Sequence, residues 1–228
     1  MDTFKDDELV QSITAYVKNY MRNYDASHSW DHIERVVGLA RYIYDKSEHK
    51  DSLDLRTIQL AALLHDVGDK KYIKPTEDPA TMIANLLISH NCPGDLASKI
   101  QTICHGVSYS SEIKDTEKVV RLIEQYPELA VVQDADRLDA LGAVGIARMF
   151  TYGGAKMNRA LQAGMDHFDE KLLKLEGMMK TDVGRQLGRE RTQRLQDFKK
   201  WWGEEVAFAA PAVEAAAPEG GEKKDKME

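Results

Sequence analysis

Leu63-Leu64-His65-Asp66-Val67-Gly68-Asp69-Lys70 is the stretch on which the fold and the chemistry of this chain depend. The run from Leu55 to Leu64 is too dense in apolar residues for a helix with one buried side. It therefore predicts a buried helix, with Asp54 as its N-cap. Such a helix ends by placing an imidazole beside a carboxylate, and burying both is costly unless they find a strong partner. A divalent metal ion suits both, because neutral imidazole and ionised carboxylate are metal ligands.

The His-Asp doublet also has an explanation that needs no ligand. In that case His65 caps the helix C-terminus and Asp66 opens a turn before Gly68. The doublet alone does not decide between a metal site and a cap, so the decision depends on the rest of the chain.

Composition predicts one helical domain followed by a tail. Apolar residues make up 43% of the 228 residues, which is enough for a proper core. They recur at helical spacing and little of the chain reads as strand, so we predict an all-α domain over residues 1–208, with loops at 107–114 and 153–156. Ala, Pro, Glu, Gly and Lys dominate residues 209–228, which predicts a disordered tail.

Charge and cysteine content limit the function classes. The net charge is −7 and the body has no basic run, which argues against binding a nucleic acid duplex but not against a nucleotide ligand. The two cysteines give no disulfide framework, and no apolar run approaches membrane-spanning length. We therefore expect a cytoplasmic protein with no membrane partner. Trp201, Trp202 and Tyr152 suit a core or a homodimer interface equally well.

Further histidines and aspartates stand in or beside apolar helices. His28 and His32 are four residues apart at the start of the second predicted helix. A single buried histidine is more often a packing residue than a ligand. Asp134, Asp136 and Asp139 lie in a later helix that is otherwise small and apolar, and three aspartates within six residues are anomalous for packing alone.

Taken in order, these residues resemble the HD superfamily of metal-dependent phosphohydrolases. The matching motifs are His32 to Val36, Leu63 to Gly68 and Ala135 to Leu138. The stretch His167 to Leu173, followed by Met179 and Thr181, is similar to the C-terminal half of small stand-alone HD hydrolases. The resemblance implies a single HD-domain helical bundle with a metal site in its core.

By the same resemblance, the metal ligands are four side chains. They are His32, His65, Asp66 and Asp136. Asp136 is preferred to Asp134 because the distant ligand of the family lies in an Ala-Asp-Arg-Leu context, and Asp134 and Asp139 are left as groups that orient a ligand or touch substrate. Two imidazoles and two carboxylates leave open positions on an octahedral ion, which suits one Mn²⁺, Co²⁺, Ni²⁺, Fe²⁺ or Mg²⁺.

The resemblance also implies residues for catalysis and substrate binding. Asp69 is similar to the acidic residue that positions or deprotonates the attacking water, with Asp66 beside it, although Asp69 also suits a loop cap. Cations at the mouth of the site neutralise phosphate charge. The substrate-binding candidates are Lys70, His28, Arg35, His167 and Asp139.

The function implied is that of a nucleoside triphosphate pyrophosphohydrolase. A 5′-nucleotidase acting on monophosphates and a non-catalytic sensor that binds metal and nucleotide are the alternatives. His90 and His105 lie in the interval where some HD proteins bind a second metal, but their local sequences lack the expected patterns. We therefore expect one ion, with a binuclear site as the alternative.

Overall fold

The computed structural model describes residues 7–69, 73, 77–158 and 160–208, and within them it contains helices and no strand. The all-α prediction is confirmed. The chain divides into two compact units, one ending at Leu195 and one beginning at Gln196. The predicted tail lies outside the described residues, and the boundary at residue 208 stays a prediction.

Eleven α-helices and four short 3-10 helices make up the described part of the chain, and none of these helices is long and apolar enough to cross a membrane. The α-helices are α1 Glu8–Tyr20, α2 Trp30–Lys46, α3 Leu55–Leu64, α4 Met82–Ser89, α5 Gly94–Val107, α6 Tyr109–Lys114, α7 Thr116–Gln125, α8 Glu128–Asp139, α9 Gly142–Lys156, α10 Leu161–Glu170 and α11 Asp182–Val206. The 3-10 helices are Met21–Asn23, Lys50–Ser52, Leu172–Lys174 and Glu176–Met178.

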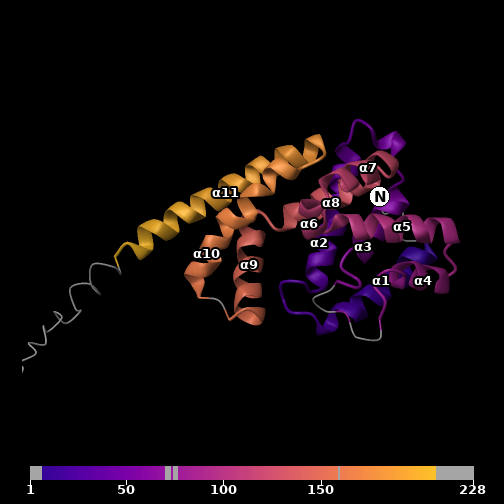
Figure 1. Cartoon of the computed structure of the whole chain (residues 1–228), viewed down its shortest axis with the longest axis horizontal. Helices are drawn as coiled ribbons and strands as arrows, with labels where there is room; N and C mark the ends of the chain where they lie inside the picture. Colours follow the sequence, from indigo (N-terminus) through magenta and orange to yellow (C-terminus); the bar gives the residue numbers. More distant parts are fainter. Residues whose placement is uncertain (1–6, 70–72, 74–76, 159, 209–228) are drawn as a thin grey trace, which may run out of the picture. The chain divides into compact units, whose positions relative to one another are not determined.

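Helix α3 forms the centre of the first unit. It packs against α1, α2, α5 and α8, and α2 also packs along α8 (Figure 1). Every residue from Leu60 to Leu64 is buried, as the apolar run predicts. The Asp54 carboxylate accepts the Arg56 N–H at 3.1 Å, which confirms the predicted N-cap. Because α3 is covered on several sides, His65, which directly follows its last residue, lies in the interior.

Two loop predictions were wrong. Residues 109–114 form α6, where the buried Glu112 pairs with Arg137 and with Lys180. Residues 153–156 are the last turn of α9, in which Gly153 is buried, and α9 packs against α10. In both segments tertiary packing overrides a weak local helix preference.

A carboxylate of α8 holds the residues that precede α11. Asp134 is fully buried and accepts the Lys180 N–H at 2.9 Å and the N–H and hydroxyl of Thr181, each at 2.7 Å. The approach requires a glycine at position 184, because a Cβ there would lie 2.1 Å from Asp134 Oδ2. The segment that begins α11 therefore binds a buried acid through Lys180 and Thr181, and Gly184 leaves room for the carboxylate.

We expect Gly184→Ala to lower the free energy of unfolding by roughly 1–3 kcal/mol, because the new methyl group overlaps the Asp134 carboxylate. Urea denaturation measures the change. Gly38→Ala in α2 is the matched control, since a Cβ there meets nothing within 4 Å. It should be neutral or raise stability by up to about 1 kcal/mol. Equal losses in both variants would contradict the docking argument.

Candidate metal centre

Two buried histidines from different helices face each other. His32 lies in the first turn of α2 and His65 directly follows α3, and their side chains are 1% and 2% exposed. Their Nε2 atoms are 3.2 Å apart. The packing of α2 against α3 therefore brings residues that are 33 positions apart to a common point.

The other ring nitrogen of each histidine is held by an acceptor. His65 Nδ1 lies 2.8 Å from the Ala62 carbonyl, which can only accept, so this nitrogen carries a hydrogen. His32 Nδ1 lies 2.8 Å from Asp139 Oδ2. The pKa of Asp139 falls to about 2, because the bonds from His32 and Arg35 outweigh burial, so this carboxylate also accepts. In their neutral forms both rings therefore direct an Nε2 lone pair to the same point.

Two carboxylates complete the cluster. One ligand atom from each of His32, His65 and Asp66 lies within 4.8 Å of the others. Asp136 Oδ1 lies 3.6 Å and 3.7 Å from the two Nε2 atoms. Asp66 Oδ2 is buried and has no hydrogen-bond partner among the described residues. A divalent ion would satisfy this oxygen and both lone pairs, so the donor set fits a metal.

Charge interactions dominate the titration of the cluster. Burial alone would lower the pKa of His65, but the Asp66 and Asp136 carboxylates raise it to about 9. Burial alone would raise the pKa of both carboxyls, but His65 and His32 hold them well below the usual range. Without a metal, the cluster therefore retains a proton on an imidazole in neutral solution.

Asp139 lies at the centre of a network behind His32. It is 1% exposed and accepts from Arg35 Nε at 2.7 Å and Arg35 Nη2 at 3.0 Å, as well as from His32. Arg148 Nη1 of α9 also donates to it, at 3.0 Å. Of the two roles that the sequence allows for Asp139, the geometry favours orienting a ligand. No sequence motif marks Arg148, which stands nine residues further along the chain.

The remaining predicted residues take different places. The ring of His28 lies beside that of His32, with centroids 6.2 Å apart. Asp69 ends the turn after the doublet, and its N–H donates to the Asp66 carbonyl at 3.3 Å. His167 lies on α10, where its Nδ1 is 3.1 Å from Glu170 Oε2. Lys70 lies outside the described residues.

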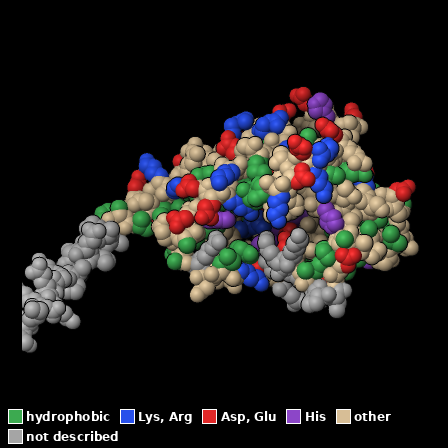
Figure 2. All heavy atoms as spheres, in the orientation of Figure 1, with side chains coloured by type: hydrophobic (Ala, Val, Ile, Leu, Met, Phe, Trp, Pro, Cys, Tyr) green, Lys and Arg blue, Asp and Glu red, His purple; other side chains and the backbone are tan. Residues whose placement is uncertain are grey.

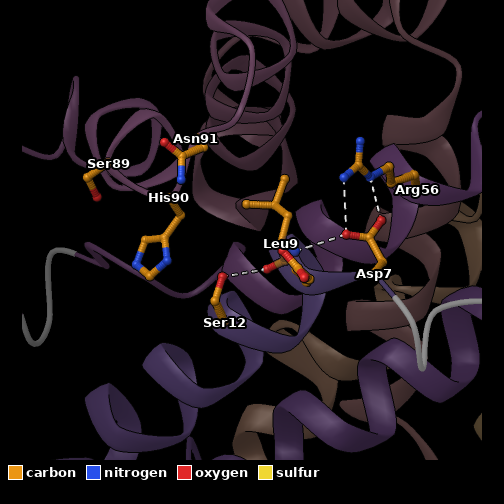
Figure 3. Close-up of a pocket in the computed structure, with 8 residues that line it drawn as sticks. Asp7, Leu9, Ser12, Arg56, Ser89, His90 and Asn91 are labelled. Carbon is orange, nitrogen blue, oxygen red and sulfur yellow. Dashed lines mark hydrogen bonds and ion pairs between the residues drawn. The ribbon is translucent and has the colours of Figure 1, made fainter.

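The face drawn in Figure 2 has a hollow around which basic, acidic and histidine side chains occur together. A different pocket, of about 780 Å³, lies between the starts of α1 and α3 and the end of α4 (Figure 3). His90 lines this pocket, and two of its charged residues, Asp7 and Arg56, are paired at 2.7 Å. His105 Nε2 contacts the Pro79 carbonyl at 2.9 Å. Neither histidine is brought to the cluster.

The chain is similar to proteins of one family. The HD domain model matches residues 29–141. The uncharacterized protein YpgQ of Bacillus subtilis strain 168 is 32% identical over 197 residues, which cover 85% of this chain and 92% of YpgQ. The crystal structure of YpgQ in complex with ADP has a TM-score of 0.69, covering 87% of this chain and 95% of YpgQ.

Two further solved structures are similar. The Lin1889 protein of Listeria innocua is 33% identical, with a TM-score of 0.64 and coverage of 87% of this chain and 97% of its own. An HD-superfamily hydrolase of Bacillus thuringiensis is 28% identical, with a TM-score of 0.63 and coverage of 87% and 96%.

The raised pKa of His65 leads to a prediction for metal binding. A divalent ion needs the neutral ring, so it must displace the proton that the metal-free cluster holds up to about pH 9. We expect Mn²⁺ to release about one proton on binding near pH 7, and its affinity to rise about tenfold per pH unit up to about pH 9. Titration calorimetry in buffers of different ionisation enthalpy measures both. An affinity that is independent of pH in this range would contradict the assignment of His65.

Proposed function

The chain belongs to the HD domain family of metal-dependent hydrolases, and on that premise we propose that it hydrolyses nucleoside triphosphates to monophosphates and pyrophosphate. The observation that carries this proposal is the convergence of two imidazole Nε2 atoms and two carboxylates on one point. Such a donor set leaves open positions on an octahedral ion, where water and a phosphoryl oxygen can bind.

In this proposal the metal ligands are His32, His65, Asp66 and Asp136. When bound, a divalent ion supplies Lewis-acid activation of water and of a phosphoryl oxygen. Mn²⁺, Co²⁺, Ni²⁺, Fe²⁺ and Mg²⁺ all accept mixed nitrogen and oxygen ligands. The hydrogen bonds from His65 Nδ1 to Ala62 and from His32 Nδ1 to Asp139 support the assignment, because they fix both rings with Nε2 toward the cluster.

Asp69 is the proposed proton acceptor for the attacking water. It follows Asp66 by three residues, in the turn that continues from α3. Its carboxylate and that of Asp66 both raise the pKa of the Tyr24 phenol, after the larger effects of burial and of Tyr20, so the two acids act on one neighbour. A carboxylate in hydrogen-bond reach of a polarised water can accept its proton as the bond to phosphorus forms.

Two cations and two histidines are proposed to bind the substrate. Arg35 is 37% exposed and keeps further N–H groups beyond those that it donates to Asp139. Lys70 follows Asp69, and His28 lies beside His32. His167 is the proposed contact from α10. These groups would neutralise and orient the triphosphate, of which pyrophosphate is the leaving group.

A nucleotide is the proposed substrate class for one further reason. YpgQ, which matches this chain over most of its length, has been crystallised in complex with ADP. A protein that binds a nucleoside diphosphate has room for a nucleoside and for a chain of phosphates. The net charge of −7 also disfavours a nucleic acid duplex as substrate.

A hydrolysis panel tests this proposal. Nucleoside mono-, di- and triphosphates are incubated with Mn²⁺, Co²⁺ or Mg²⁺, with a chelator control, and the phosphate product is identified. We expect pyrophosphate from triphosphates only. Orthophosphate from monophosphates would instead make the protein a 5′-nucleotidase, and nucleotide binding without any product would make it a sensor.

The Asp136→Asn variant tests the ligand assignment of Asp136 separately from a general loss of stability. We expect metal affinity and activity to fall together by at least about 100-fold, because loss of a ligand exceeds the 10- to 100-fold cost typical of supporting residues. Asp134→Asn is the matched control on the same helix, since Asp134 bonds Lys180 and Thr181. It should lower stability and leave Mn²⁺ affinity unchanged. The reverse pattern would transfer the ligand role to Asp134.

A further inference from the structure

We propose that Arg148 of α9 is a positioning residue, which fastens the carboxylate that orients His32 and, at the same time, the backbone turn that carries His28. The inference rests on the proposed metal centre and does not depend on which nucleotide is hydrolysed. In this proposal α9 stabilises the cluster, although it carries none of the proposed metal ligands.

The first bond of Arg148 is to Asp139. Nη1 donates to Asp139 Oδ2 at 3.0 Å, and the same oxygen accepts from His32 Nδ1 at 2.8 Å. Asp139 is 1% exposed, so its charge depends on these donors and on Arg35. Arg148 therefore helps to hold the oxygen that sets the ring orientation of His32.

The second bond of Arg148 is to the backbone before α2. Nε donates to the Ser27 carbonyl at 2.7 Å. Ser27 is 1% exposed, and its N–H and hydroxyl both donate to Asp25 Oδ1. Its hydroxyl oxygen also lies 2.7 Å from His28 Nδ1. Hydrogen bonds within the turn therefore stabilise it, and Arg148 connects the turn to α9.

A neighbouring side chain on α9 supports the same turn. Tyr152 follows Arg148 by four residues, so the two share one face of the helix. The Tyr152 ring lies edge-on to the His28 ring, with centroids 5.4 Å apart. One face of α9 therefore contacts both the backbone and the imidazole of the turn beside His32.

The chemistry of the contact requires the guanidinium fork. Nε and Nη1 point to two different acceptors, one on α8 and one before α2, and a lysine ammonium is a single point charge that cannot reproduce this planar arrangement. Arg148 is 15% exposed, whereas Arg35 is 37% exposed. This difference favours a positioning role for Arg148 and leaves phosphate contact to Arg35.

The test compares Arg148→Gln, Arg148→Lys and the control Arg41→Gln. Arg41 lies on α2, the helix of His32, and pairs with Asp45, where both side chains are well exposed. Titration calorimetry with Mn²⁺ alone measures metal affinity, steady-state kinetics at saturating Mn²⁺ separate kcat from KM, and thermal unfolding reports stability. Ring N–H signals in the NMR spectrum of the metal-free protein report the His32–Asp139 bond.

We expect Arg148→Gln to weaken Mn²⁺ binding by about 10- to 100-fold and to lower kcat with little change in KM. Arg148→Lys should fall between Arg148→Gln and the unaltered protein, and Arg41→Gln should match the unaltered protein. A fall in melting temperature with unchanged Mn²⁺ affinity would show that Arg148 only stabilises the fold. A rise in KM alone would make it a substrate contact. Either result would overturn the proposal, as would full rescue by lysine.

The NMR measurement keeps the inference separate from the proposed function. In the metal-free protein the His32 Nδ1–H is buried and bonded to Asp139, so it should exchange slowly with solvent. Arg148→Gln should speed this exchange and Arg41→Gln should not. If the unaltered protein bound no metal, the proposed function would fail while this readout would still decide the role of Arg148. An unchanged exchange rate in Arg148→Gln would overturn that role.

Discussion

The structure depends on the convergence of two buried histidines and two carboxylates on one point at the end of α3. His32 and His65 approach within 3.2 Å through nitrogens whose opposite ring atoms are already bonded to acceptors. Neutral rings would therefore face lone pair to lone pair, beside two carboxylates. Only a proton or a metal ion makes this arrangement favourable. The same charge interactions raise the pKa of His65 and lower the pKa values of Asp66 and Asp136.

The three aspartates of helix α8 have different partners. An α-helix turns about 100° per residue, so Asp136 and Asp139, three residues apart, lie close to one face, and Asp134 points to another side. Asp134 accepts from the backbone that begins α11, Asp136 joins the histidines, and Asp139 accepts from His32, Arg35 and Arg148. Of these three aspartates, one stabilises the fold, one joins the cluster and one holds the His32 ring.

Glu112 and Asp139, two buried carboxylates outside the cluster, are compensated by cations from other parts of the fold. Glu112 pairs with Arg137 of α8 and with Lys180, so α6 is tied both to the core and to the segment before α11. Asp139 is likewise balanced by arginines of α2 and α9. Removing one partner from such a pair leaves an uncompensated buried charge, which is more costly than the pair itself is stabilising. The C-terminal helices of the first unit are therefore coupled to the helices that carry the cluster.

Much of this was readable from the sequence. The density of apolar residues over Leu55 to Leu64 exceeds what one face of a helix can hold, so the buried α3 was predictable, as were the His-Asp doublet that follows it and the Asp54 cap. The motifs around His32 and Asp136 indicated the family. The role of Asp139 was left open, because side-chain direction within a short acidic run depends on which helices pack against it.

Helix α6 was missed because its polar sequence is held by the ion pairs of Glu112, and those form only once α8 and Lys180 are in place. Arg148 belongs to no motif, since its two acceptors, Asp139 and the Ser27 carbonyl, are brought together only by folding. Local periodicity determines which segments are helical and buried. Partners that meet across long sequence separations are decided by the tertiary structure, because hydrogen bonds and charge pairs form between neighbours in space.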